Sequence, residues 1–285
     1  MVSRFTKLAF VAPLLLLVLG LSIYPTINLY YSSFHRVVFG ERSTPFVGLA
    51  NFRQVLSTPD FRHSLWFSLE YTIVTTLLEL ALGIILAIAI SRLKRGRGPI
   101  VSLLVLPMMV APALLGIMFR LLLNDFVGPI TQLLQLAGHF ISPLSPQYVV
   151  PTLFLIDVVM WTPFVMLITY AGVEAVPPDM LEAAAVDGAS PWQAIRYITL
   201  PTIKPVVAVA ALLRAIDAFK TFDTIQVLTG GGPGTLTTTV SVYIYRAAFG
   251  LKDLGQASAA AVLLLLILAI PLGLIVKRLV ELNRG

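Results

Sequence analysis

The chain has 285 residues, of which 58% are hydrophobic and only 12% are charged, with a formal net charge of +6 and a mean hydropathy of +0.90. A soluble domain carries about 25% charged residues, so this chain cannot cover a water-facing surface, and lipid must be one of its solvents. The positive charge fits basic cytoplasmic loops and does not indicate nucleic acid, because no basic stripe is interleaved with aromatic residues.

Six apolar stretches are long enough to cross a membrane, since a spanning helix needs about 20 mostly apolar residues. They cover about residues 7–30, 65–90, 100–123, 149–172, 205–228 and 257–276. The first begins with basic residues as a signal peptide does, but no small-residue cleavage site follows it, so we expect an uncleaved span. The sequence therefore predicts an all-α polytopic membrane protein with six transmembrane helices in a single transmembrane domain over 1–285.

Lysine and arginine are more numerous in the segments that an inside N-terminus would place in the cytoplasm. Those segments hold Arg4, Lys7, Arg92, Lys94, Arg95, Arg97, Arg196, Lys204, Lys277, Arg278 and Arg284. The outside segments hold Arg36, Arg42, Arg53, Arg62, Arg246 and Lys252, and counting Arg120 with them leaves the inside excess in place. The positive-inside rule then predicts that both termini lie in the cytoplasm.

The longest cytoplasmic connection, about 174–204, is predicted to hold two short helices. Pro178 suits the first turn of the first helix, and Gly188 suits a left-handed residue after its end. Ser190 is a helix cap with Gln193 three residues later, which opens the second helix. We expect Pro201 to end this second helix.

The same connection contains a spaced motif, E-A-A-x3-G-x9-I-x-L-P, formed by Glu182-Ala183-Ala184, Gly188 and Ile198-x-Leu200-Pro201. It resembles the signature of permease subunits of binding-protein-dependent ABC importers at every fixed position. Softer motifs at 46–52, 222–233 and 243–249 resemble the carbohydrate subfamily of maltose-, trehalose- and glycerol-phosphate-like permeases. The alternative is a purely structural role, in which the motif forms a helix pair on the surface that docks on no partner.

The resemblance implies the type I ABC importer permease fold, in which this loop is a coupling helix docked on an ATPase. It assigns ATPase coupling to Glu182, Ala183, Ala184, Asp187, Gly188, Ile198, Leu200 and Pro201. It also implies a bacterial inner-membrane complex with a second permease subunit as heterodimer, two ATPase subunits and an extracytoplasmic solute-binding protein. No G-x-x-x-x-G-K-[ST] motif occurs, so we expect no cofactor here, with ATP and Mg held by the partner subunit.

The predicted spans carry ionisable residues, which are costly in a membrane and call for a reason. In the fifth span Arg214, Asp217, Lys220 and Asp223 follow one another at i, i+3 steps, a spacing at which neighbours touch. One reading is an internally paired ladder that faces other helices, and the other is a watery pathway that bonds solute hydroxyls. The sequence alone does not decide between the paired ladder and the watery pathway.

A carboxylate beside aromatic faces can grip a hydroxylated ring, because the carboxylate accepts O–H groups and the ring faces cover C–H groups. Alignment on the cytoplasmic motif carries the pathway contacts of maltose-type relatives to Asp157, Met160, Trp161 and Phe164, and to Arg214 and Ala218. With the ladder residues Asp217 and Lys220 they form the expected substrate pathway. Glu70 and Glu79, in the second span, are expected to form hydrogen bonds between helices rather than to contact substrate.

Two other functions compete with an importer permease. A secondary, ion-coupled transporter could use Asp157 or Asp217 for protons, but the sequence shows no convincing internal repeat. A membrane enzyme lacks a catalytic constellation, because the chain has no cysteine and His35, His63 and His139 show no ligand spacing. The solute is expected to be a sugar or sugar derivative, and Arg214 leaves an anionic one, such as glycerol phosphate, open.

Overall fold

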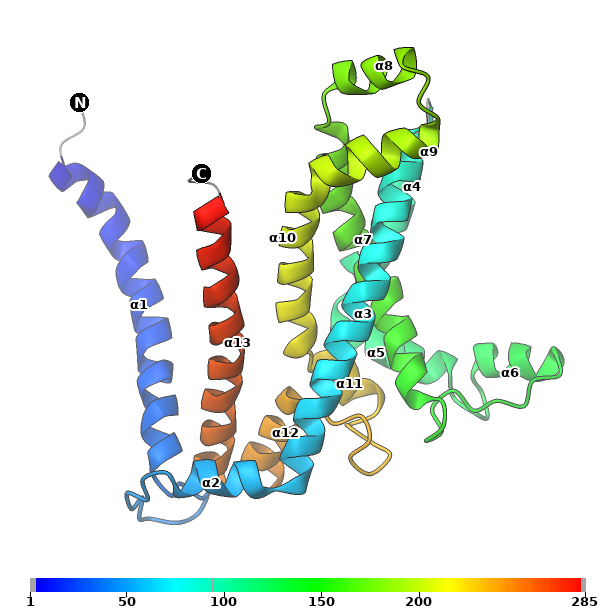
Figure 1. Cartoon of the computed structure of the whole chain (residues 1–285). Coiled ribbons are helices and arrows are strands. Elements are labelled where there is room, and N and C mark those ends of the chain that lie inside the picture. Colours follow the sequence, from blue (N-terminus) through cyan, green and yellow to red (C-terminus); the bar gives the residue numbers. More distant parts are fainter. Residues whose placement is uncertain (1–3, 94, 283–285) are drawn as a thin grey trace. The chain divides into compact units, whose positions relative to one another are not determined.

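The computed structural model of the chain describes residues 4–93 and 95–282, with side chains over 10–93 and 95–269. The described residues are mainly helical, and they divide into two compact units, 1–62 with 240–285 and 63–239 (Figure 1). Lys94 and Arg284 lie outside the described residues, as do the side chains of Arg4, Lys7, Lys277 and Arg278.

The first unit consists of α1 (Arg4–Phe34), α2 (Ala50–Ser57), α12 (Val240–Tyr245), the π-helical turn η3 (Arg246–Gly250) and α13 (Leu254–Leu282). The long helix α13 packs against α1 and α2. Asn51 on α2 fastens the end of α1, because its side-chain amide donates to Ser33 O at 3.0 Å and to His35 O at 2.9 Å. Gly255 completes this contact, since a Cβ there would lie 2.6 Å from His35 O.

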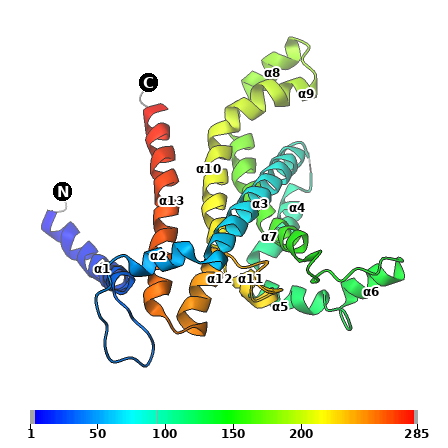
Figure 2. The ribbon, with the colours of Figure 1, turned by 60° about the horizontal axis from the view of Figure 1, so that its bottom comes forward.

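The second unit is a helical bundle that carries the predicted site. It contains α3 (Pro59–Ser91) from residue 63 onward, α4 (Arg97–Val105), α5 (Pro112–Leu122), α6 (Pro129–Leu136) and α7 (Val149–Glu174). The predicted coupling segment forms a helix pair, α8 (Pro178–Val186) and α9 (Pro191–Ala194), which leads into α10 (Leu200–Phe219) and α11 (Asp223–Leu228). Helices α3, α7 and α10 run close together in both views of the chain (Figures 1 and 2).

Four helical segments of the described chain are long and apolar enough to cross a membrane: Phe10–Phe34, Pro59–Ser91, Val149–Glu174 and Pro191–Leu228. They coincide with four predicted spans. The predicted sixth span lies in α13, of which Leu254–Ala269 qualifies as a shorter apolar helix. The six-helix count and the inward termini therefore stay predictions.

The prediction of a continuous third span over 100–123 is wrong. The chain forms α4, the 3-10 turn η1 (Leu106–Met109) and α5, and the two halves bend by 89°. Pro107 and Pro112 donate no backbone N–H, and Ala111 before the second proline adopts polyproline-like backbone with φ −59° and ψ 136°. The two prolines therefore break the helix inside an otherwise apolar run.

The fifth predicted span, 205–228, also differs from the structure. The helix α10 begins at Leu200 and ends at Phe219, and α11 starts only at Asp223. Pro201 does not end the preceding helix: it lies in the first turn of α10. A π-helical turn, η2 (Ile195–Thr199), joins α9 to α10, and its wider turn relieves the clash that a proline ring makes with the preceding turn.

Glycines allow the helices of the second unit to approach closely. A Cβ on Gly83 of α3 would lie 2.7 Å from Val165 Cγ1 and 3.0 Å from Met166 N, both on α7. A Cβ on Gly172 of α7 would lie 3.1 Å from Val206 Cγ1 on α10. Membrane helices gain packing from such small residues, because their backbones can come together without a side chain between them. Gly83 sets the distance between α3 and α7 most tightly.

We expect Gly83→Ala to destabilise the protein by about 1–3 kcal/mol, because the added methyl overpacks the contact with α7. Gly20→Ala is the matched control, since Gly20 also lies in an apolar helix and a Cβ there meets nothing within 4 Å. Thermal unfolding of both variants in detergent measures the difference. An unchanged or raised midpoint for Gly83→Ala would contradict the close approach of the two helices.

Candidate functional site

A buried cluster of three charged residues, the Arg214 triad, joins three helices of the second unit. Glu79 lies on α3, Asp157 on α7 and Arg214 on α10, and they are 0%, 3% and 1% exposed. Arg214 Nη2 donates to Glu79 Oε1 at 3.0 Å and also to Asp157 Oδ2. Arg214 Nε lies 2.5 Å from Glu79 Oε2. One guanidinium therefore holds a carboxylate on each of the two neighbouring helices.

The pairing explains how these charges can occupy the middle of apolar helices. A charge taken out of water costs several kcal/mol even after the protein relaxes, unless a partner and hydrogen bonds compensate it. One oxygen of Glu79 accepts a hydrogen bond from Arg214 Nη2, and the other forms an ion pair with Nε, so both oxygens of the carboxylate lie against the cation. Removal of the cation alone would leave two carboxylates buried between helices.

The triad continues toward partly exposed groups on α7 and α10. The guanidinium carbon of Arg214 lies 5.3 Å from the centre of the Trp161 ring, a cation–π distance. The Trp161 and Phe164 rings meet edge to face, with centroids 6.2 Å apart. Asp217 Oδ2 lies 3.7 Å from Arg214 Nη1, and Lys220 Nζ lies 3.5 Å from Asp217 Oδ1. The side chains of Asp217 and Lys220 are 40% and 56% exposed.

The predicted pathway residues therefore separate into two groups. Asp157, Met160, Arg214 and Ala218 are buried in the described structure. Those that remain partly or fully accessible are Trp161, Phe164, Asp217 and Lys220. In this conformation the accessible group can meet a solute and the buried group cannot.

The charged ladder is shorter than predicted, and one of the two expected interhelical glutamates is confirmed. The ladder runs from Arg214 to Asp217 and Lys220 but does not reach Asp223, because α10 ends first and Asp223 begins α11. Glu79 forms the expected hydrogen bond between helices, whereas Glu70 lies exposed. The i, i+3 spacing favoured Asp217 on the same helix as the partner of Arg214, whereas the strongest partners lie on other helices. The available signal was one arginine and two acids near the middle of three different spans.

The helix pair α8–α9 has the local structure that its sequence predicts. Gly188, between α8 and α9, has φ +78°, in the left-handed region that favours glycine. Gln193 N donates to Ser190 Oγ at 3.3 Å and Ser190 N donates to Gln193 Oε1 at 2.7 Å, which is the expected capping box. Five large apolar side chains of this segment are exposed: Met180, Leu181, Val186, Trp192 and Tyr197.

The predicted coupling residues divide between the tip and the base of this segment. Glu182, Ala183, Asp187 and Gly188 are exposed and Ala184 is half-buried, all on or directly after α8. The other three lie at the base. Ile198 is within the π-helical turn η2 and is half-buried, and Leu200 (half-buried) and Pro201 (exposed) begin α10. The tip therefore presents small and apolar groups together with the carboxylates of Glu182 and Asp187, and the base continues directly into α10.

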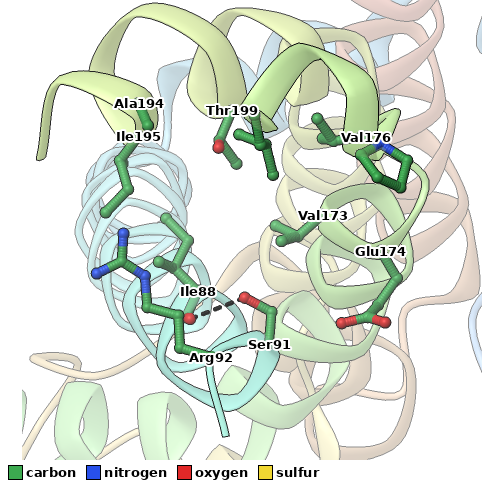
Figure 3. A pocket seen from close by; sticks show the side chains of 11 residues that line it. Ile88, Ser91, Arg92, Val173, Glu174, Val176, Ala194, Ile195 and Thr199 are labelled. Atoms are coloured by element: carbon green, nitrogen blue, oxygen red, sulfur yellow. Dashed lines mark hydrogen bonds between the residues drawn. The ribbon is translucent and has the colours of Figure 1, made fainter. Parts of the chain in front are cut away.

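A hollow of about 280 Å³ lies beneath the helix pair, between the ends of α3 and α7 (Figure 3). Ile88, Val173 and Ile195 give it an apolar lining, and Arg92 and Glu174 lie on its rim. Arg92 Nη2 donates to Pro191 O at 3.1 Å, which holds the start of α9 against α3. At the opposite rim, Arg97 Nη1 lies 3.2 Å from Glu174 Oε1. Two arginines thus fasten the ends of α7 and α9 to the α3–α4 connection.

Comparison with known proteins supplies a family. A family described as "Binding-protein-dependent transport system inner membrane component" matches residues 79–284. The trehalose/maltose transport system permease protein MalF of Thermococcus litoralis is 36% identical over 257 residues, which cover 89% of this chain and 86% of the relative. The sn-glycerol-3-phosphate transport system permease protein UgpA of Agrobacterium fabrum is 32% identical over 261 residues, covering 90% and 88%.

Solved structures show the same fold. A chain from the crystal structure of a bacterial ABC transporter involved in the import of the acidic polysaccharide alginate superposes with a TM-score of 0.83. It is 23% identical, and the match covers 93% of this chain and 92% of that one. The predicted ABC importer permease fold is thus confirmed.

We expect Arg214→Leu to destabilise the protein by about 3–5 kcal/mol, because it leaves Glu79 and Asp157 buried without their cation. Asp217→Asn is the control, since it removes one contact of 3.7 Å from a partly exposed side chain and should cost at most about 1 kcal/mol. Yield of monodisperse protein and thermal unfolding in detergent compare the two. Equal losses would contradict the assignment of Arg214 to the buried triad rather than to the ladder.

Proposed function

The chain belongs to the family of binding-protein-dependent transport system inner membrane components, and on that basis we propose that it is the membrane-spanning permease subunit of an ATP-driven importer for a sugar or sugar derivative. The observation that carries the proposal is the E-A-A motif on a capped, exposed helix pair that runs directly into α10. The full complex would contain a second permease subunit, two ATPase subunits and an extracytoplasmic solute-binding protein.

The exposed helix pair supports docking on an ATPase. The tip combines small and apolar side chains, which can enter a groove at low desolvation cost, with the exposed carboxylates Glu182 and Asp187, which can pair with basic groups of a partner. The base is held by Arg92 and is continuous with α10 through η2, so a force on the tip reaches the level of Arg214 along one helical path. The ATP and Mg would belong to the partner, since the sequence holds no phosphate-binding glycine loop.

The accessible groups on α7 and α10 support a hydroxylated solute. Trp161 and Phe164 offer ring faces, and Asp217 offers acceptor oxygens for O–H groups. Arg214 is committed to Glu79 and Asp157, so its presence no longer favours an anion. A second candidate, an anionic sugar derivative, rests on the partly exposed Lys220 and on the relative that transports sn-glycerol 3-phosphate.

We expect Gly188→Val to uncouple ATP hydrolysis from transport. A β-branched residue resists the φ of +78°, so the loop must rearrange and carry α8 away from its ATPase groove. The complex, purified from its native cells through a tag on this chain and reconstituted in liposomes, should lose stimulated ATP hydrolysis and uptake together. Uptake of maltose, trehalose and sn-glycerol 3-phosphate is measured separately, which also decides between the two solute classes.

Gly138→Val is the matched control for backbone strain. Gly138 has φ +84°, and a Cβ at either glycine would meet nothing within 4 Å, so the two substitutions impose similar local strain. Only the variant at Gly188 should lose coupling. Normal stimulation in Gly188→Val, with protein levels equal to the control, would mean that this loop is not the site of ATPase coupling.

We expect Trp161→Ala to lower the apparent affinity for the transported sugar by about 5–70-fold, the range for loss of one aromatic contact of about 1–2.5 kcal/mol. Assembly of the complex should be unaffected. Trp66→Ala is the control, because Trp66 is 67% exposed on the same unit. Unchanged uptake kinetics in Trp161→Ala would leave Trp161 as a packing residue and remove it from the pathway.

A further inference from the structure

We propose that Arg214 is a positioning residue, which does not contact the solute but holds the Trp161 ring and the Asp217 carboxylate in place for it. The inference rests on the proposed function of those two residues in the pathway. It adds Glu79, which carries no transport role in the sequence-based assignment, as the residue that orients Arg214. Each edge and face of the Arg214 guanidinium contacts a different side chain.

The plane of the guanidinium is fixed by two helices. Glu79 on α3 faces the Nε and Nη2 edge, with distances of 2.5 Å from Nε to Oε2 and 3.0 Å from Nη2 to Oε1. Asp157 on α7 accepts a second hydrogen bond from Nη2. Ion pairing at the Nε edge, together with hydrogen bonds from Nη2 to carboxylates on two helices, opposes rotation about the long axis of the side chain. The guanidinium therefore has one orientation that α3 and α7 impose on it.

That orientation determines where the remaining surfaces of Arg214 point. One face meets the ring of Trp161, with 5.3 Å between the guanidinium carbon and the ring centre. The remaining nitrogen, Nη1, forms an ion pair of 3.7 Å with Asp217 Oδ2. Trp161 and Asp217 are the partly accessible groups that contact Arg214. A ring and a carboxylate from two different helices are thus aligned by one buried cation.

Stability alone is a weak explanation for such a triad. Apolar residues of similar volume commonly replace a buried ion pair without loss, because they avoid the desolvation of the charges. What apolar residues cannot reproduce is a cation–π contact with a ring together with an ion pair to a carboxylate. A lysine cannot either, since its ammonium is a point charge that neither forks nor stacks. The chemistry of arginine is needed here for direction rather than for charge.

The chain offers a direct readout of the position of Trp161 that needs no solute. It has three tryptophans, Trp66, Trp161 and Trp192, so W66F/W192F leaves Trp161 as the single one. In this background the full chain in lipid nanodiscs is examined by acrylamide quenching and fluorescence anisotropy. In Arg214→Lys, which keeps the positive charge, we expect the quenching constant of Trp161 to rise about twofold and its anisotropy to fall, because the stacked contact is lost.

The matched control is Arg97→Lys, which alters the exposed pair of Arg97 with Glu174 at the cytoplasmic end of the same unit. It should leave the Trp161 signals unchanged. A second variant, E79M/D157L/R214M, removes all three charges at once and so leaves none of them unpaired. We expect it to give monodisperse protein in which Trp161 is again mobile. Wild-type quenching and anisotropy in either folded variant would overturn the proposal.

The remaining outcomes are also decisive. If neither variant yields monodisperse protein, the triad is a folding element and its positioning role is rejected. If Trp161 becomes mobile in both variants but Trp161→Ala transports normally, the positioning stands and the pathway role of Trp161 fails. The fluorescence result and the uptake result thus separate this inference from the function on which it rests.

Discussion

A buried guanidinium between three apolar helices is the constraint on which the second unit depends. Arg214 cannot face hydrocarbon at acceptable cost, so α10 has to present it to the carboxylates of α3 and α7. That requirement fixes the rotation of all three helices about their own axes. It also requires the backbones to lie close enough for the ion pairs to form, which Gly83 and Gly172 permit. Charge pairing and small-residue packing are therefore two parts of one arrangement.

The sequence predicts features whose causes are local. A capping Ser190, a first-turn proline and a left-handed Gly188 are decided by a few neighbouring residues, and the helix pair has the predicted form. Long apolar runs likewise predict the helices that cross the membrane. Where prolines interrupt such a run, the hydropathy signal gives no indication of the break, and the bend of 89° between α4 and α5 lies in a predicted continuous span. Pro107 and Pro112 are the sequence signal for this break, but the high hydropathy of the run favours a continuous helix.

Partner choice among charges is not a local property, and the sequence could not decide it. Arg214 has Asp217 three residues away, so a ladder within one helix is the simplest interpretation of the pattern. The structure shows that the stronger contacts go to α3 and α7, with Asp217 a more distant neighbour at 3.7 Å. Arg214, predicted to line the solute pathway, is therefore an internal ion-pair partner of α3 and α7. The accessible residues Trp161, Phe164, Asp217 and Lys220 remain as the candidate pathway surface.

The helix α10 links this surface to the helix pair. The tip of the helix pair is exposed, its base is held by Arg92, and the π-helical turn η2 leads directly into α10. A π-helical turn is a place where a helix can change its axial register at modest cost, and such turns are common at functional sites. Beyond it, α10 is tied to α3 and α7 through Arg214, so the outer half of the helix cannot move alone. Any displacement of the helix pair must therefore either be absorbed at η2 or move α3, α7 and α10 together. In the proposed complex, this division between a compliant turn and a rigid triad would convert a push on the helix pair into a change of access around Trp161.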